Sequence, residues 1–288
     1  MMSSSTTHSR RNARYPFASC RPALLRGFSL LEVAIVLIII TVLLTAVSVP
    51  LASQVQTRRM EETRRLLEEA KEALLGFAMA NGRFPCPAFA NATSNSAGRE
   101  SFCTAATGAC TGTETLTPQT HGNCSNFYNG FLPASTLGLS SLDTQGFLQD
   151  AWATQSNRIR YVVYGGTVGA FNFPFTSQTA MQGATVSNLG NPAQTYLYVC
   201  SSGTGVTTTT CGPTANELTT KAAVLLLSLG ENAPTGGTST DEAKNVDNNI
   251  VFVSHPPVSL ATNTFDDITT WIPSTIVIKK MLDAGKLP

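Results

Sequence analysis

The longest apolar stretch of the chain lies near its start and contains a single charge. Residues 28–52 are FSLLEVAIVLIIITVLLTAVSVPLA, in which Glu32 is the only charged side chain. About 20 apolar residues suffice for a helix to cross a hydrocarbon core, whereas a secretory signal peptide has a shorter apolar core that precedes its cleavage site. The pattern predicts a membrane-spanning helix over residues 28–52, in which the carboxylate of Glu32 needs a partner.

An amphipathic pattern follows over residues 53–82, which are rich in strong helix formers. Its apolar side chains recur at steps of three and four residues, at Leu66, Leu67, Ala70, Leu74 and Phe77. We therefore expect one helix over residues 28–80, since Pro85 forbids its continuation. A coiled-coil dimer is the alternative for the second half, but the apolar stripe is short and the following region is able to cover it.

Residues 83–288 are expected to form a globular domain. Its first part, 83–150, lacks periodicity and is rich in Ser, Thr, Gly and Asn, which is typical of a variable loop region. Strand-like runs follow at 158–164, 195–200, 222–229 and 249–254, so a sheet is predicted within 151–272, and a short helix within 273–288. The economical architecture is α+β, with the long helix packed on an antiparallel sheet of about four strands.

Charge is distributed unevenly along the chain. Residues 1–27 contain five arginines and no acidic residue, while the whole chain has a net charge of only +1. The basic start predicts a cytoplasmic N-terminus by the positive-inside rule. The small net charge gives no global field that would favour nucleic acid as a partner.

Six cysteines follow the single one at position 20, and they lie in loops rich in small polar residues: Cys86, Cys103, Cys110, Cys124, Cys200 and Cys211. An even number in this setting favours disulfides and an oxidising compartment. A bridge between Cys200 and Cys211 is the first expectation because of their short separation. The other pairings stay open.

The segment from Gly27 to Val33, GFSLLEV, followed by the apolar run, resembles the processing motif of type IV pilins and type II secretion pseudopilins. The resemblance implies that prepilin peptidase removes residues 1–27 by cutting after Gly27, and that Phe28 is N-methylated. It also implies that Glu32 aids recruitment into the filament. Cleavage creates an ammonium group at Phe28, which would pair with Glu32 of a neighbouring subunit.

A second, weaker resemblance concerns calcium. Residues 228–232, then 236–237, then Asp241-Glu242 resemble the calcium loop of major pseudopilins. Calcium takes six to eight oxygen ligands, and the candidate ligands are Asp241, Glu242, Asn245 and Asp247. A solvated turn is the alternative, because EF-hand spacing is absent. The pair Asp266-Asp267 is expected to serve as a cap or in a salt bridge.

Catalytic motifs are absent from the sequence. It contains no phosphate-binding glycine loop, no H-E-x-x-H and no G-x-S-x-G. Its histidines beyond the leader, His121 and His255, lie in loops and are expected to be solvated. The sequence therefore indicates a protein that is not an enzyme.

The function implied by the resemblance is that of a filament subunit, in a type IV pilus or a type II secretion pseudopilus. Its expected partners are prepilin peptidase, other subunits, an inner-membrane assembly platform and, before assembly, the lipid bilayer. The expected location is a single pass in the inner membrane with a periplasmic domain, and then a periplasmic or extracellular filament. The mature chain is larger than most major subunits, which favours a minor subunit.

Two alternatives remain. One is a tip adhesin or a minor pilin that binds DNA or glycans through the Cys-rich loops. The other is a periplasmic enzyme tethered by an ordinary signal-anchor, which would need neither the Gly27–Phe28 junction nor Glu32.

Overall fold

The computed structural model describes residues 29–89, 97–110, 114–166, 171–235, 239–260 and 263–287, without the side chains of 45–53, 259 and 260. Its α-helices are α1 (Leu30–Asn81), α2 (Ala134–Leu137), α3 (Gln178–Gln182), α4 (Val186–Leu189) and α5 (Ser274–Asp283). Its strands are β1 (Phe102–Cys103), β2 (Glu114–Thr115), β3 (Gly130–Phe131), β4 (Arg160–Val163), β5 (Leu197–Cys200), β6 (Glu217–Ser228), β7 (Val251–Val253), β8 (Val258–Leu260), β9 (Asn263–Phe265) and β10 (Ile268–Pro273). Short 3₁₀ helices are η1 (Gln155–Asn157), η2 (Thr214–Asn216), η3 (Ala233–Thr235) and η4 (Glu242–Asn245).

The chain divides into two compact units, Met1–Ala52 and Ser53–Pro288. Helix α1 has 52 residues and contributes to both units. At its start, the Ser29 hydroxyl accepts a hydrogen bond from the backbone N–H of Glu32 at 3.1 Å, as an N-cap residue does. At its end, Gly82 adopts a φ of +70°, which stops the helix in the left-handed conformation that glycine tolerates.

Among the side chains that the structure describes, no helix is both long enough and apolar enough to cross a membrane. The side chains described in the apolar part of α1 end at Leu44, before the residues needed for a span of about 20 have been reached. This finding contradicts the membrane-spanning assignment of 28–52 and the single-pass inner-membrane location predicted from it.

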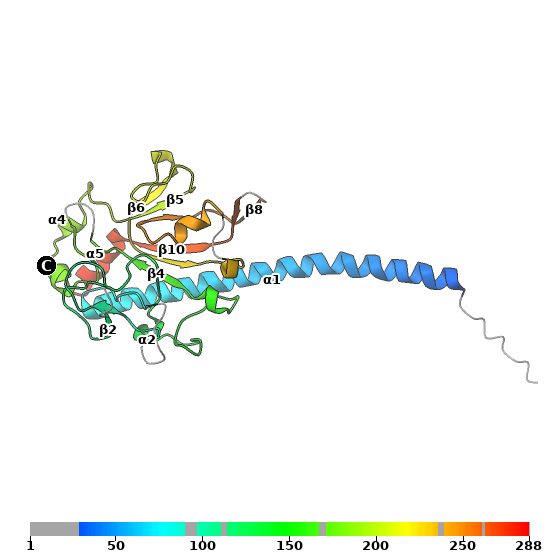
Figure 1. Ribbon diagram of the computed structural model, residues 1–288, viewed down its shortest axis with the longest axis horizontal. Coiled ribbons are helices and arrows are strands. Elements are labelled where there is room, and N and C mark those ends of the chain that lie inside the picture. Colours follow the sequence, from blue (N-terminus) through cyan, green and yellow to red (C-terminus); the bar gives the residue numbers. More distant parts are fainter. Residues whose placement is uncertain are drawn as a thin grey trace, which may run out of the picture. The chain divides into compact units, whose positions relative to one another are not determined.

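The main sheet has six strands and is built around β6 (Figure 1). This strand has 12 residues and pairs antiparallel with β4 and β10 along its second half and with β5 along its first half. The residues of β6 from Ala222 to Ser228 are all buried. Apolar and polar side chains therefore do not alternate along this part of the strand, and every residue except the final serine is apolar. At the far edge, β7 pairs with β5 in parallel, while β3 pairs with β4 at the other end of the order.

The predicted fold is corrected by this topology. The structure is α+β, and the four strand runs expected from the sequence coincide with β4, β5, β6 and β7. The pilin-like fold with about four antiparallel strands is wrong, because the sheet has six strands and contains the parallel pair β5–β7. The sequence pattern missed β10, where two threonines interrupt the apolar run, and it carries no information on strand direction.

Within the second unit, α1 packs on the sheet through one stripe. Leu67, Ala70, Leu74 and Ala78 are buried in the same cluster as the strands of the sheet. The expected members Leu66 and Phe77 lie at the margin of this stripe and are half-buried. Thr63 is fully buried, and its hydroxyl accepts a hydrogen bond from the backbone N–H of Ala151 at 3.2 Å. The stripe therefore fixes the rotation of α1 about its axis.

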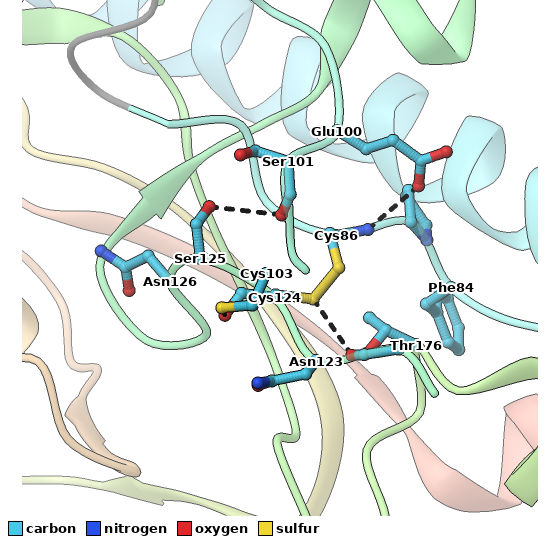
Figure 2. The surroundings of a disulfide bond; sticks show 12 residues. Phe84, Cys86, Glu100, Ser101, Cys103, Asn123, Cys124, Ser125, Asn126 and Thr176 are labelled. Carbon is cyan, nitrogen blue, oxygen red and sulfur yellow. Dashed lines mark hydrogen bonds between the residues drawn. A yellow bond between two sulfur atoms is a disulfide. The ribbon is translucent and has the colours of Figure 1, made fainter. Parts of the chain in front are cut away.

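All six cysteines that follow Cys20 form disulfides. The expected bridge Cys200–Cys211 is confirmed, and the pairings that the sequence left open are Cys86–Cys124 and Cys103–Cys110. Figure 2 shows the first of these beside Glu100, whose carboxylate accepts a hydrogen bond from the backbone N–H of Cys86 at 3.3 Å. The bridges Cys86–Cys124 and Cys103–Cys110 cross-link the loop region that follows α1.

Candidate metal centre

Three carboxylates from two separate segments meet at one end of the sheet. Glu242 comes from η4, and Asp266 and Asp267 come from the turn between β9 and β10. One oxygen of each lies within 4.8 Å of the others. Glu242 is fully buried and Asp267 is 4% exposed, so the cluster is largely withdrawn from water.

The loop after β6 holds Asp266 in place. One carboxylate oxygen of Asp266 accepts hydrogen bonds from the backbone N–H groups of Glu231 and Asn232, at 2.7 and 3.1 Å. Gly230, which precedes them, has a φ of +66°, and a Cβ added there would lie 2.5 Å from the Asp266 carboxyl carbon. The loop approaches the aspartate this closely only because residue 230 is a glycine.

Buried Asp150 anchors the same loop from the other side. Its carboxylate accepts hydrogen bonds from the Ser228 hydroxyl and from the Asn157 amide, and that amide also donates to the carbonyl of Gly230. Burial raises the pKa of Asp150, and these hydrogen bonds oppose the increase. The Asp150 segment, which precedes β4, is thus a structural support for the carboxylate cluster.

One carboxylate oxygen of Glu242 accepts hydrogen bonds, and the other has no hydrogen-bond partner among the described residues. Its Oε1 accepts hydrogen bonds from the Asn232 amide at 2.8 Å and from the backbone N–H of Asp266 at 3.2 Å. Its Oε2 is buried and has no hydrogen-bond partner among the described residues, and the same holds for Oδ1 of Asp266 and Oδ1 of Asn232. Three oxygen acceptors are therefore left without a donor, which is costly in a buried site.

Burial and mutual repulsion shift the ionisation of the two aspartates. The pKa of Asp267 rises to about 8, because burial and then the neighbouring carboxylates outweigh a hydrogen bond from Asn245 at 2.6 Å. The pKa of Asp266 rises to about 6, chiefly through burial and also through its proximity to Glu242. Arg160 lowers the pKa of Asp267 electrostatically, although burial lowers the pKa of Arg160 itself.

No lysine, arginine or histidine in the described part of the chain lies within 4.0 Å of these three carboxylates in an ion pair. Buried carboxylates without a cation must either take up protons or bind an external cation. The donor set here consists of carboxylate and amide oxygens only, which is the set that Ca²⁺ prefers. The residues present therefore fit a calcium ion.

Of the four ligands predicted from the sequence, only Glu242 belongs to this cluster. Asp241 is occupied elsewhere: it accepts hydrogen bonds from the backbone of Gly203, from His255 Nε2 at 3.0 Å and from Asn263 at 2.8 Å. Burial alone would raise the pKa of Asp241, but these hydrogen bonds outweigh it and leave the pKa below its ordinary value. His255 also stacks on Phe265 with ring centroids 3.9 Å apart, so it is not the solvated loop histidine that the sequence suggested.

Asn245 and Asp247 are also not direct members. The Asn245 side-chain amide donates a hydrogen bond to the backbone carbonyl of Val253 and accepts one from the backbone N–H of Val253. These two hydrogen bonds fix η4 to β7. Asp247 is exposed, with its carboxylate 3.9 Å from Lys244 Nζ. Asp266 and Asp267, expected to cap or to form a salt bridge, supply the other carboxylates instead. Adjacent acids in a strand-to-strand turn were visible in the sequence, but their approach to Glu242 was not.

The residues of the processing motif fall at the border of the described chain. Gly27 and Phe28 lie outside the described residues, while Glu32 lies exposed in the first turn of α1. Comparison with protein-family models, with curated proteins and with solved structures finds no match to this chain.

Proposed function

We propose that this protein is a non-enzymatic subunit of a helical filament of the type IV pilus or type II secretion pseudopilus class, processed after Gly27 and assembled through α1. The observation that carries the proposal is the surface of α1 from Leu30 to Leu44. Its large apolar side chains are all exposed, from 44% at Val33 and Ile40 to 92% at Leu30. A contiguous apolar surface of this kind marks an interaction site, and a bundle of identical helices would cover it.

Glu32 is the one charged group on that surface. Its carboxylate is exposed in the first turn of α1, where the helix dipole favours an anion. Cleavage after Gly27 would place an ammonium group at Phe28, and this group would pair with Glu32 of a neighbouring copy. The pairing would fix the axial register of helices whose other contacts are apolar and able to slide.

A local role for Glu32 competes with this pairing. The sequence Ser29-x-x-Glu32 is a capping-box pattern, and the Ser29 half of the box is formed. Glutamine serves as well as glutamate at this capping position, but it carries no charge. The substitution Glu32→Gln therefore separates pairing from capping.

The test co-expresses the full chain with a prepilin peptidase and an inner-membrane assembly platform, and measures two quantities, the size of the product and its recovery in sheared filaments. Gly27→Val should leave a precursor longer by 27 residues, whereas Glu32→Gln and Glu32→Ala should be cut normally and yet fail to enter filaments. Normal cutting of Gly27→Val would overturn the processing step. If Glu32→Gln formed as many filaments as the unsubstituted protein, the pairing role of Glu32 would be excluded and only its capping role would remain.

We further propose that Glu242, Asp266 and Asp267 hold a calcium ion that stabilises the loop after β6. The support is the buried Oε2 of Glu242, which has no partner among the described residues, in a cluster of carboxylates with no cationic side chain in ion-pair contact there. Bound calcium would supply the missing positive charge and fasten η4 to the β9–β10 turn. We assign this ion a structural role.

A further inference from the structure

A pocket of about 840 Å³ lies between two segments that are distant in the sequence. One wall comes from the Cys-rich loop region, through residues 106–108, 120–123 and 127. The other comes from residues 165–166, 171–174, 177, 179–180, 183 and 188, and two of these belong to α3. The volume falls within the range typical of small-molecule sites.

The two walls are fastened to each other. The carbonyl of Thr120 accepts hydrogen bonds from the Ser177 hydroxyl at 3.1 Å and from the backbone N–H of Thr179 at 3.3 Å. Gly122, with a φ of +67°, lies against the backbone of Ser177, since an added Cβ would be 2.2 Å from the nitrogen of Ser177. The bridge Cys86–Cys124, shown in Figure 2, and the bridge Cys103–Cys110 hold the first wall. The pocket is thus preformed.

The chemistry of the lining is neutral. Among the described residues around the pocket there is no aspartate, glutamate, lysine or arginine. Aromatic rings are present, and Phe173 is 54% exposed and meets Phe171 edge to face, with ring centroids 6.0 Å apart. The lining also contains hydroxyl and amide groups from Thr, Ser and Asn.

His121 adds a directed donor. Its Nδ1 accepts a hydrogen bond from the backbone N–H of Asn123 at 3.0 Å, which places the proton of the neutral ring on Nε2. Nε2 is buried and has no partner among the described residues. His121 is one of the residues that line the pocket.

We infer that this pocket binds a neutral saccharide. A pyranose ring offers an apolar C–H face for an exposed aromatic ring and a rim of hydroxyl groups for amides, hydroxyls and an imidazole N–H. Charged ligands would find no counter-charge in the lining, and their desolvation would go uncompensated. The inference goes beyond the proposed filament role and does not depend on it.

The experiment measures saturation transfer by NMR on the purified full chain, kept soluble in a polyoxyethylene detergent that carries no sugar. The probes are glucose, galactose, mannose and N-acetylglucosamine, with N-acetylneuraminic acid as the charged probe and N-acetyl-trialanine amide as the peptide probe. We expect transfer to the ring protons of at least one neutral sugar and none to the charged sugar.

Variants locate the binding. Phe173→Ala removes a ring that is 54% exposed, and it should weaken the sugar signal about tenfold. Val186→Ala is the matched control, since Val186 is an exposed apolar residue (44%) outside the pocket lining, and it should leave the signal unchanged. Absence of transfer to every neutral sugar, an equal signal in Phe173→Ala, or transfer to the peptide probe alone would each overturn the inference.

Discussion

Arg83 and Glu100 form a two-pronged ion pair that is almost fully buried. The guanidinium nitrogens lie 2.9 and 3.1 Å from the two carboxylate oxygens, and the residues are 5% and 7% exposed. The Arg83 guanidinium also lies over the rings of Phe77 and Phe102, at 5.3 and 5.2 Å from their centroids. This pair connects the end of α1 to the first loop after it, next to the Cys86–Cys124 bridge (Figure 2).

Breaking this pair should destabilise the protein strongly. Arg83→Ala leaves the Glu100 carboxylate buried and unpaired, at a cost of about 3–5 kcal/mol. For a domain of this size the expected fall in melting temperature is about 2–4 °C per kcal/mol. Arg65→Ala is the control, because the Arg65–Glu62 pair is exposed and 4.0 Å apart, and it should cost less than about 1 kcal/mol. Similar losses in both variants would show that Arg83–Glu100 is not a structural anchor.

Calcium and pH should act together on stability. Asp266 and Asp267 have pKa values raised to about 6 and about 8 in the folded protein, from an ordinary value of 3.8. Because the folded state favours the protonated forms, their contribution to stability is complete below about pH 4. It is lost as the pH rises through 6 and 8. In a chelator, the melting temperature should therefore decrease over this range.

Added calcium should reverse that decrease at pH 8 and have little effect at pH 5, where protons compete for the same oxygens. At 100 times its dissociation constant, a bound ion stabilises the folded state by about 2.7 kcal/mol. Asp267→Asn should flatten the pH dependence and abolish the calcium effect, whereas Asp283→Asn, in an exposed pair with Lys279, should change neither. Identical melting with and without calcium at pH 8 would rule out the proposed site.

Gly230 should be irreplaceable for two separable reasons. Gly230→Ala places a Cβ 2.5 Å from the Asp266 carboxyl carbon and forces a left-handed backbone conformation. Gly138 has nearly the same φ, +69°, but nothing within 4 Å of an added Cβ. Gly138→Ala should therefore show only the backbone cost of about 1–2 kcal/mol. Gly230→Ala should lose more and should also lose the stabilisation by calcium, both read from thermal melting.

Local patterns in the sequence were sufficient for the parts of the fold that depend on near neighbours. Short-range periodicity located four strands and the stripe of α1 that packs on the sheet, and the short separation of Cys200 and Cys211 indicated their bridge. The Gly27–Phe28 junction with Glu32 is also a local pattern, and it supplies the filament hypothesis. Each of these features is encoded within a few residues, where spacing alone decides which side chains meet.

Only the tertiary structure decided the features that join distant segments. The direction of β7 beside β5 is set by the chain path between them, and neither strand's side chains encode it. The carboxylate cluster likewise needs η4 and the β9–β10 turn to meet, which replaces three of the four predicted calcium ligands. Many different closures of such long loops cost similar conformational entropy. The burial of apolar side chains in the whole domain therefore decides which segments meet.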